Sequence, residues 1–180
     1  IRRRQLIELI EKAAQEGRND FVKDILIRYK DIKRIYAYQL ETYWNNISSV
    51  EAYYRTNMDF LKRDVRSYFF KEGNSVFTKV DDLPPAKYNP GANISNSLMH
   101  VESIVNGTVE NSVVFKKAYI GNNCVIKNFI LSLKDVYIGD NAVIENCIVE
   151  SRGTIEANAC YKSEPGDIRI VVEKKDRFII

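Results

Sequence analysis

The side chains that could do chemistry are few, and the best placed of them surround the single tryptophan of the chain. This polar run comprises Trp44, Asn45, Asn46, Ser48 and Ser49. Glu51 lies three residues after Ser48, and this spacing is typical of the first turn of a helix, where each side chain bonds an otherwise unpaired amide. The sequence therefore predicts a polar loop that leads directly into a helix.

Charge and composition exclude several functions. The 180 residues include 27 basic and 24 acidic side chains, so a net charge of +3 is too small to indicate nucleic-acid or membrane-surface binding. No apolar run approaches the roughly 20 residues that cross a bilayer. The chain shows no signal peptide and does not begin with Met, so we expect a fragment or trimmed chain of a cytoplasmic protein.

The cysteines and the histidine restrict the chemistry further. Cys124, Cys147 and Cys160 are odd in number and form no Cys-x-x-Cys pair, which predicts neither a metal site nor a disulfide framework and favours a reducing cytosol. His100 is the only candidate for the base that an acyltransferase needs. Because it lies ahead of the regular repeats described below, a surface or linker role is the simpler interpretation.

The first part of the chain predicts short helices and one strand. A helix over residues 5–15 has an apolar face made of Leu6, Ile7, Leu9, Ile10, Ala13 and Ala14. Gly17 is a natural stop for this helix, and Asn19 or Asp20 is placed to cap a second one. Residues 35–40 alternate as a strand does.

Prolines then divide the chain. The helix after the polar loop is expected to end between Arg63 and Arg66. Pro84 and Pro85 cannot continue a helix, because proline lacks the amide donor, and residues 89–91 are a turn signal. We therefore predict a first part over residues 1–65, a linker over 66–93 and a second domain over 94–180.

The second domain contains a repeat of 18 residues. Residues 119–130 match residues 137–148 at eight of twelve positions, and isoleucines stand six apart in each copy: Ile120 and Ile126, Ile138 and Ile144. A coil of three short strands needs about 18 residues, and successive coils stack at about 4.8 Å, so that one aliphatic side chain per strand lines a common axis. The repeat therefore predicts a parallel β-helix.

Other repeat positions predict its corners. Gly121 and Gly139 follow the axial isoleucines, where we expect a turn with positive φ. Asparagine tolerates such a corner as well, which suits Asn123 and Asn141. Cys124 shares its register with an alanine, so it is interpreted as a small packing residue. The less regular spacing before residue 114 predicts a distorted first coil, and residues 167–180 are interpreted as a closing strand or cap.

Four segments, in this order, resemble the ADP-glucose pyrophosphorylases, or glucose-1-phosphate adenylyltransferases. Residues 20–25 resemble the family's Asp-Phe-Gly-Lys-Asp segment, and residues 43–49 resemble its Tyr-Trp-Arg-Asp-Val-Gly-Thr motif. Residues 56–61 resemble its Ala-Asn-Met/Leu-Asp-Leu segment, and residues 84–88 its Pro-Pro-Ala-Lys-Phe linker. The β-helix follows in the expected place, so the resemblance covers nearly the whole chain.

The resemblance implies a fold and a reaction. Residues 1–65 would be the last elements of an α/β nucleotidyltransferase domain, and residues 94–180 a left-handed parallel β-helix of hexapeptide repeats used for regulation and subunit contacts. The family joins ATP to glucose 1-phosphate, with Mg²⁺, and makes ADP-glucose for glycogen. Its nucleotide loop would lie before Ile1. Asp20, Lys23 and Asp24 become candidates for substrate binding.

The departures from the family motif concern charge. Asn45 replaces the family's arginine, Asn46 replaces its acidic Mg²⁺ ligand, and Ser48-Ser49 replaces Gly-Thr. An amide oxygen does not neutralise Mg²⁺, which is usually held by carboxylates and substrate phosphates. In this respect the chain resembles the non-catalytic GlgD-type subunit, which pairs with a catalytic homologue and raises its activity. Two alternatives stay open: an active adenylyltransferase that tolerates both asparagines, and a hexapeptide acyltransferase.

Partners and effectors follow from the same resemblance. We expect a hetero-oligomer with the catalytic homologue, or a homo-oligomer, with neither nucleic acid nor membrane bound. A phosphorylated-sugar effector would need cations, for which the candidates are Lys116, Lys117, Lys174, Lys175 and Arg177. Solvated basic side chains are the simpler interpretation of all five.

Overall fold

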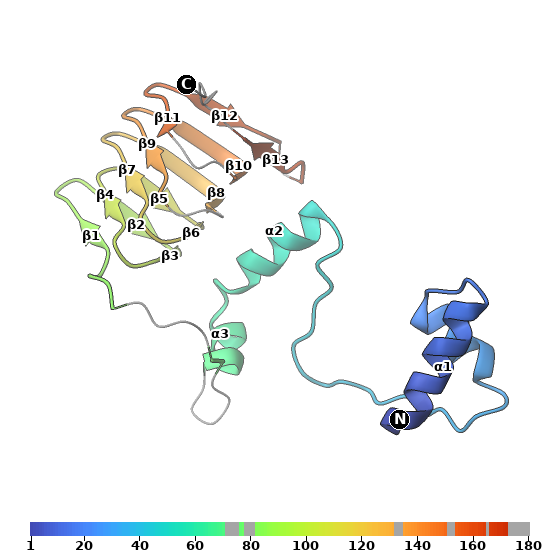
Figure 1. The fold of residues 1–180 in the computed structure, drawn as a ribbon. Coiled ribbons are helices and arrows are strands. Elements are labelled where there is room, and N and C mark those ends of the chain that lie inside the picture. Colours follow the sequence, from blue (N-terminus) through green and yellow to red (C-terminus); the bar gives the residue numbers. More distant parts are fainter. Residues whose placement is uncertain (71–75, 78–81, 132–134, 151–153, 165, 173–180) are drawn as a thin grey trace. The chain divides into compact units, whose positions relative to one another are not determined.

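The computed structural model of the chain describes residues 1–70, 76–77, 82–131, 135–150, 154–164 and 166–172. The chain divides into two compact units, residues 1–42 and residues 43–180 (Figure 1). Within the described ranges, no helix combines the length and the apolar character needed to cross a lipid bilayer.

The first unit contains two short helices, as the sequence predicts. α1 (Arg3–Gln15) begins two residues earlier than expected and is followed by Gly17, whose φ of +69° lies in the left-handed region. The second helix, η1 (Phe21–Ile27), has π-helical geometry. Of the two candidate caps the chain uses Asp20, whose carboxylate accepts hydrogen bonds from the amides of Val22 and Lys23, both at 2.9 Å.

The predicted strand over residues 35–40 is wrong. These residues adopt no regular structure, and Ile35, Tyr36 and Tyr38 are exposed. A strand needs a neighbour to bond its backbone amides and carbonyls. Every described strand lies in the second unit, so this alternating segment has no strand to pair with in its own unit.

The second unit begins with two helices where the sequence predicted one. α2 (Val50–Asp59) ends earlier than expected, and α3 (Arg63–Phe70) follows after a break. The Arg66 guanidinium donates to the carbonyl oxygens of Phe60 and Leu61 at 2.8 and 2.6 Å. It thereby satisfies acceptors that the end of a helix leaves unpaired.

The rest of the second unit is a parallel β-helix of about four turns with three flat sides (Figure 1). Side 1 comprises β1 (Lys87–Tyr88), β4 (Ile104–Val105), β7 (Tyr119–Ile120), β9 (Tyr137–Ile138) and β11 (Thr154–Ile155). Side 2 comprises β2 (Asn93–Ser95), β5 (Thr108–Glu110), the first halves of β8 (Val125–Leu131) and β10 (Val143–Val149), and β12 (Cys160–Lys162). Side 3 comprises β3 (Leu98–Met99), β6 (Val113–Val114), the second halves of β8 and β10, and β13 (Arg169–Val171).

The pairing register confirms the repeat of 18 residues. Tyr119 pairs with Tyr137 and Val125 with Val143, in each case 18 positions on. The first coil is shorter, since Asn93 pairs with Thr108, 15 positions on. The predicted distortion of this coil is therefore a shortening of its loops. The paired strands begin at β1, inside the range that the sequence assigned to a linker.

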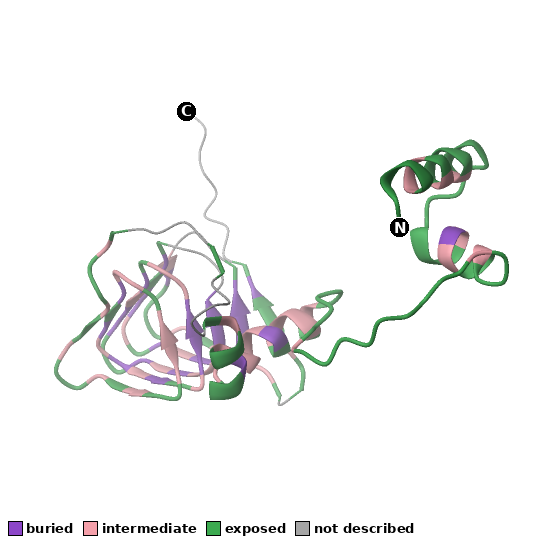
Figure 2. Cartoon of the chain, turned by 90° about the horizontal axis from the view of Figure 1, so that it is seen from below, coloured by how far each residue is buried: buried purple, intermediate pink, exposed green. Residues whose placement is uncertain are grey.

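The axial side chains form the core. Ile120, Ile126, Ile138 and Ile144 are fully buried, and the purple strands of Figure 2 show that burial concentrates in the β-helix. Each such side chain contributes roughly 1.5–3 kcal/mol when it leaves water. Cys124 belongs to the same buried cluster, as the sequence predicted.

The corners differ from prediction in one respect. Gly121 and Gly139 do not have positive φ; instead, the following coil leaves no room for a side chain. A Cβ at Gly121 would lie 2.5 Å from Asp140 Oδ1, and one at Gly139 would lie 2.6 Å from the backbone nitrogen of Ala157. Glu156 occupies the same register in the last coil of side 1, where its side chain is exposed.

Asparagines make the positive-φ corners and bond to one another from coil to coil. Asn123 and Asn141, the two that the sequence predicted, have φ of +55° and +59°, and the Asn123 amide donates to Asn141 Oδ1 at 3.2 Å. A second ladder runs along the corner between sides 2 and 3 through Asn96, Asn111, Asn128 and Asn146. Each of these side chains satisfies its neighbour's polar group in addition to allowing the turn.

The C-terminal segment closes the β-helix in part as expected. β13 pairs with the second half of β10, and Val171 is buried at the end of the core. Residues 173–180, the rest of the predicted cap, lie outside the described residues.

Candidate functional site

The polar loop over residues 43–49 leads into α2, and the cap lies one residue later than the sequence predicted. Ser49, not Ser48, is the N-cap: its hydroxyl accepts a hydrogen bond from the amide of Ala52 at 3.1 Å. The Glu51 carboxylate accepts from its own backbone amide and from Ser49, and these bonds hold the pKa of Glu51 below its usual value. Ser49 is therefore committed to starting the helix.

Asn45 and Tyr43 fasten the loop to α2. The Asn45 amide nitrogen donates to Thr56 Oγ1 at 2.6 Å, and this hydroxyl donates in turn to the carbonyl of Ala52 at 2.7 Å. The Tyr43 hydroxyl donates to Asp59 Oδ2 at 3.1 Å. Burial is the main reason that the pKa of Tyr43 lies above its usual value. Asn45 of the loop thus has a structural partner, Thr56, on the helix that follows.

The remaining loop side chains face solvent. Trp44 is 70% exposed, and Asn46 and Ser48 are exposed as well. A neutral amide at residue 46 and a serine hydroxyl that caps a helix are a poor donor set for Mg²⁺, which prefers carboxylates. Among the described residues, no three histidine, cysteine or acidic side chains gather as a metal site would require. The residues of this loop do not fit a Mg²⁺ site.

α2 packs along side 3 of the β-helix on a column of aliphatic residues that point outward. Val113, Ile130 and Ile148 alternate with the axial residues and face away from the core, yet they are only 7%, 0% and 4% exposed. The Tyr54 hydroxyl donates to the backbone carbonyl of Asn128 at 2.8 Å. Burial raises the pKa of Tyr54 to about 12.

Two grooves lie between α2, with its flanking segments, and the β-helix. The first, of about 480 Å³, is lined by Ile47, Ser48, Ser49, Val50 and Tyr53 from the loop and helix, and by Ile148, Glu150 and Ile170 from the β-helix. The second, of about 360 Å³, is almost wholly apolar and is lined by Asn57, Phe60, Phe70, Leu98, Met99, His100, Val113, Val114 and Phe115. The polar loop is thus the wall of a groove whose opposite wall is the β-helix.

The other candidate residues lie elsewhere. Asp20, Lys23 and Asp24 are in the first unit, and Asp24 accepts a hydrogen bond from the Asp20 amide at 3.0 Å. The backbone amide of Lys23, followed by that of Val22, holds the pKa of Asp20 below its usual value. All three residues serve the start of η1, and their substrate role stays a prediction.

Two of the five basic candidates fall within the residues that the structure describes. Lys117 forms an ion pair with Glu102 at 3.1 Å, and Lys116 lies beside it in the chain. Lys174, Lys175 and Arg177 lie outside the described residues. An effector role for these five residues therefore stays a prediction.

His100 directly follows β3 and is exposed. Its Nδ1 accepts a hydrogen bond from the amide of Val101 at 2.8 Å. This geometry matches the surface role that the sequence favoured for the histidine.

Sequence reasoning missed Tyr54 and the outward aliphatic column. A signal was present, because Phe129-Ile130-Leu131 and Cys147-Ile148-Val149 are uninterrupted apolar runs in equivalent strands. Strands with one wet face alternate, whereas strands that are buried on both faces read as continuous apolar runs. These runs indicate that another element covers side 3.

Comparison with known proteins finds one matching protein family and several similar enzymes. Residues 84–162 match the model of the GlmU-like C-terminal hexapeptide family. The chain is 32% identical over 119 residues to the glucose-1-phosphate adenylyltransferase of Geobacillus stearothermophilus, covering 66% of this chain and 31% of that protein. It is 33% identical over 122 residues to the enzyme of that name from Clostridium botulinum strain Alaska E43, covering 67% and 31%.

A further relative, from Mycoplasma mobile and of the same name, is 29% identical over 126 residues, covering 68% of this chain and 33% of that protein. The chain thus spans about a third of the length of these relatives. These matches and the coil register together show that the chain carries a GlmU-like C-terminal hexapeptide domain and is similar, over two thirds of its length, to the C-terminal part of glucose-1-phosphate adenylyltransferases.

Proposed function

We propose that this chain is the C-terminal part of a GlgD-type regulatory subunit, which supports ADP-glucose synthesis by a catalytic homologue in the cytoplasm. Similarity to glucose-1-phosphate adenylyltransferases supports a place in this reaction family. The observation that carries the finer assignment is the pair Asn45 and Asn46, where the family motif has an arginine and an aspartate.

The charge change bears on the transition state. Transfer of a nucleotidyl group builds negative charge on phosphate oxygens, which a metal ion and cationic side chains must neutralise. Two amides supply neither charge. Loss of a single transition-state donor lowers rates by about 10²–10³ in other enzymes, so loss of both groups predicts a subunit with very weak turnover of its own.

The contacts of the loop support a structural use for it. Asn45 bonds Thr56 on α2, and α2 is seated on the β-helix through Tyr54 and the aliphatic column. The loop is therefore fixed to the β-helix through α2. In a regulatory subunit, such a loop moves together with the β-helix and can transmit a shift of the β-helix to the partner subunit, instead of binding a metal.

The experiment compares three samples of full-length proteins: this protein alone, its catalytic homologue alone, and the two together, all with ATP, glucose 1-phosphate and Mg²⁺. We expect the lone protein to make ADP-glucose at less than a hundredth of the rate of the homologue, and the mixture to exceed the homologue alone. An ordinary rate from the lone protein, or no gain in the mixture, overturns the proposal.

A charge-restoring variant tests the stated cause. Asn45→Arg with Asn46→Asp returns both family charges, and we expect it to raise the lone rate at least tenfold. Asn45→Gln with Asn46→Gln is the matched control, because it changes size and keeps two neutral amides. If the control gains as much as the charged variant, charge is not the cause.

A further inference from the structure

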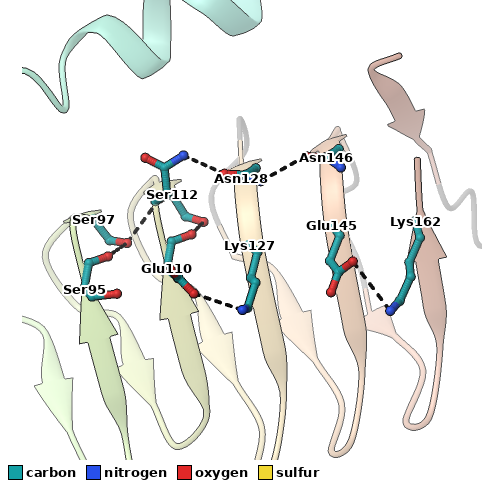
Figure 3. A network of polar contacts seen from close by, with 10 residues as sticks. Ser95, Ser97, Glu110, Ser112, Lys127, Asn128, Glu145, Asn146 and Lys162 are labelled. Carbon is teal, nitrogen blue, oxygen red and sulfur yellow. Dashed lines mark hydrogen bonds and ion pairs between the residues drawn. The ribbon is translucent and has the colours of Figure 1, made fainter. Parts of the chain in front are cut away.

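Side 2 of the β-helix carries an outward column of alternating charge, one residue per coil. The column consists of Glu110, Lys127, Glu145 and Lys162, called here the charge column, and the backbone pairing places these residues side by side on β5, β8, β10 and β12 (Figure 3). The 18-residue repeat aligns Lys127 with Glu145, but the order of all four charges becomes visible only when the coils are stacked.

The charges are paired within the chain and still accessible. Lys127 Nζ lies 3.0 Å from Glu110 Oε2, and Lys162 Nζ lies 3.5 Å from Glu145 Oε2. The side chains of these four residues are between 31% and 51% exposed. Each therefore keeps hydrogen-bonding capacity for a group that approaches from outside.

The order of signs makes the column complementary to itself when reversed. Read along the β-helix, the column is minus, plus, minus, plus. A copy related by a two-fold axis that lies parallel to side 2 and perpendicular to the column turns its own side 2 towards the first and presents plus, minus, plus, minus. Each charge then faces its opposite. A parallel copy in the same register would instead place like charges together, which is unfavourable.

We propose that side 2 binds a second copy of this chain in the antiparallel orientation, with Glu110 facing the second copy's Lys162 and Lys127 facing the second copy's Glu145. Such a contact is isologous and closes as a dimer. The spacing also fits, because both columns repeat at the same coil rise of about 4.8 Å. The proposal does not depend on the regulatory function proposed above.

Side 2 offers some apolar surface beside the charges. Val125 and Val143 lie two residues before Lys127 and Glu145 on the same strands, point outward as they do, and are half-buried. Exposed ion pairs contribute little affinity singly and act mainly on orientation and register. The valines add the burial that charges do not provide. Side 3 is already covered by α2, and the outward column of side 1 runs from Lys87 through Ile104, Tyr119 and Tyr137 to Thr154 without alternating charge. Side 2 is therefore the uncovered side that has a self-complementary pattern.

Exchanging charges in pairs tests the contact without removing any intramolecular ion pair. Glu110→Lys with Lys127→Glu gives plus, minus, minus, plus, and Glu145→Lys with Lys162→Glu gives minus, plus, plus, minus. Each of these patterns meets its own reversed copy like on like. We expect sedimentation of each full-length variant to show a dimer dissociation constant at least tenfold above that of the wild type. The dissociation constant of the wild-type dimer should itself rise with salt concentration.

Two rescues exclude misfolding as the cause. The two paired variants are complementary to each other, so their mixture should form a heterodimer with a dissociation constant within threefold of the wild-type value. The variant with all four charges exchanged should also recover. Unchanged dimerisation in the paired variants, absence of rescue, or a wild type that shows no such association step would each overturn the proposal.

A cysteine trap distinguishes the antiparallel contact from a shifted parallel one. Glu110 and Lys162 are three coils, about 14 Å, apart within one chain, which is too far for a disulfide. In a Cys160→Ser background, Glu110→Cys with Lys162→Cys should therefore cross-link only between copies, and Glu110→Cys alone should not. Cross-linking by the single variant would refute the antiparallel register.

Discussion

The Tyr54 hydroxyl donates a hydrogen bond to the backbone carbonyl of Asn128 at 2.8 Å, and this bond joins the helix after the polar loop to a corner of the β-helix. Asn128 is also a member of the asparagine ladder, bonded through its side chain to Asn111 at 2.6 Å and Asn146 at 3.1 Å. The same helix holds Asn45 through Thr56. Loop, helix and ladder therefore form one continuous set of contacts.

Tyr54→Phe removes only the hydroxyl from this set. The half-buried carbonyl of Asn128 loses this donor, so we expect the second unit to lose about 1 kcal/mol of stability, measured by urea unfolding of the full-length protein. Tyr88→Phe is the matched control, because Tyr88 is 52% exposed. Equal effects of the two substitutions would contradict the role given to the bond.

The same bond predicts a dependence on alkaline pH. The pKa of Tyr54 is about 12 in the fold and near 10 in the unfolded chain, so the folded state holds the proton more tightly. The stability due to the neutral phenol is complete below pH 10 and declines as the pH rises towards 12. The wild type should lose more stability over this window than Tyr54→Phe, as followed by thermal melts; parallel curves would reject this assignment.

Gly121→Ala tests the close approach of successive coils. The new Cβ would lie 2.5 Å from Asp140 Oδ1 and 2.8 Å from the Asp140 backbone nitrogen, so a loss of roughly 1–3 kcal/mol is expected from overpacking. Glu156→Ala changes the same register position in the last coil of side 1 and should alter stability by about 0.5 kcal/mol or less. Chemical denaturation of both variants measures the difference, and a harmless Gly121→Ala would show that the coils can part.

Two substitutions of Asn128 separate its turn from its ladder. Its φ is +48°, so Asn128→Gly keeps the backbone conformation and loses the side-chain bonds, whereas Asn128→Ala loses both. We expect Asn128→Ala to be less stable than Asn128→Gly by roughly 1 kcal/mol. Thermal unfolding of the two proteins checks the order. Equal stabilities of the two variants would show that asparagine at this position does not relieve backbone strain.

Thiol reactivity should report the burial of the cysteines. Cys124 and Cys147 are buried, and burial raises the pKa of both thiols, so few thiolates form at pH 8. Cys160 is exposed. With a disulfide reagent we expect a fast phase that disappears in Cys160→Ser, while Cys124 and Cys147 react only after denaturation. Persistence of the fast phase in Cys160→Ser would contradict this.

How much the sequence could predict varies along the chain. Local signals placed the start of α1 within two residues and the start of α2 within one, and they included Asp20 among two candidate caps, because caps and helical faces are set by neighbours in sequence. The prediction of a strand at residues 35–40 was wrong, because alternation of apolar and polar residues does not show whether a second strand is present to pair with. The glycine corners were located correctly and explained wrongly, since the limiting contact with Asp140 comes from the next coil.

The sequence by itself determined the β-helix, because an 18-residue repeat with isoleucines six apart allows one aliphatic side chain per strand to reach a common axis. It also supplied the resemblance on which the neutral pair Asn45 and Asn46 is interpreted as a loss of charge. Only the tertiary structure decided what lies outside that axis: α2 on side 3, the bond from Tyr54 to Asn128, and the charge column of side 2. These contacts join residues separated by a whole coil or more, so their existence depends on how coils stack and not on any local pattern.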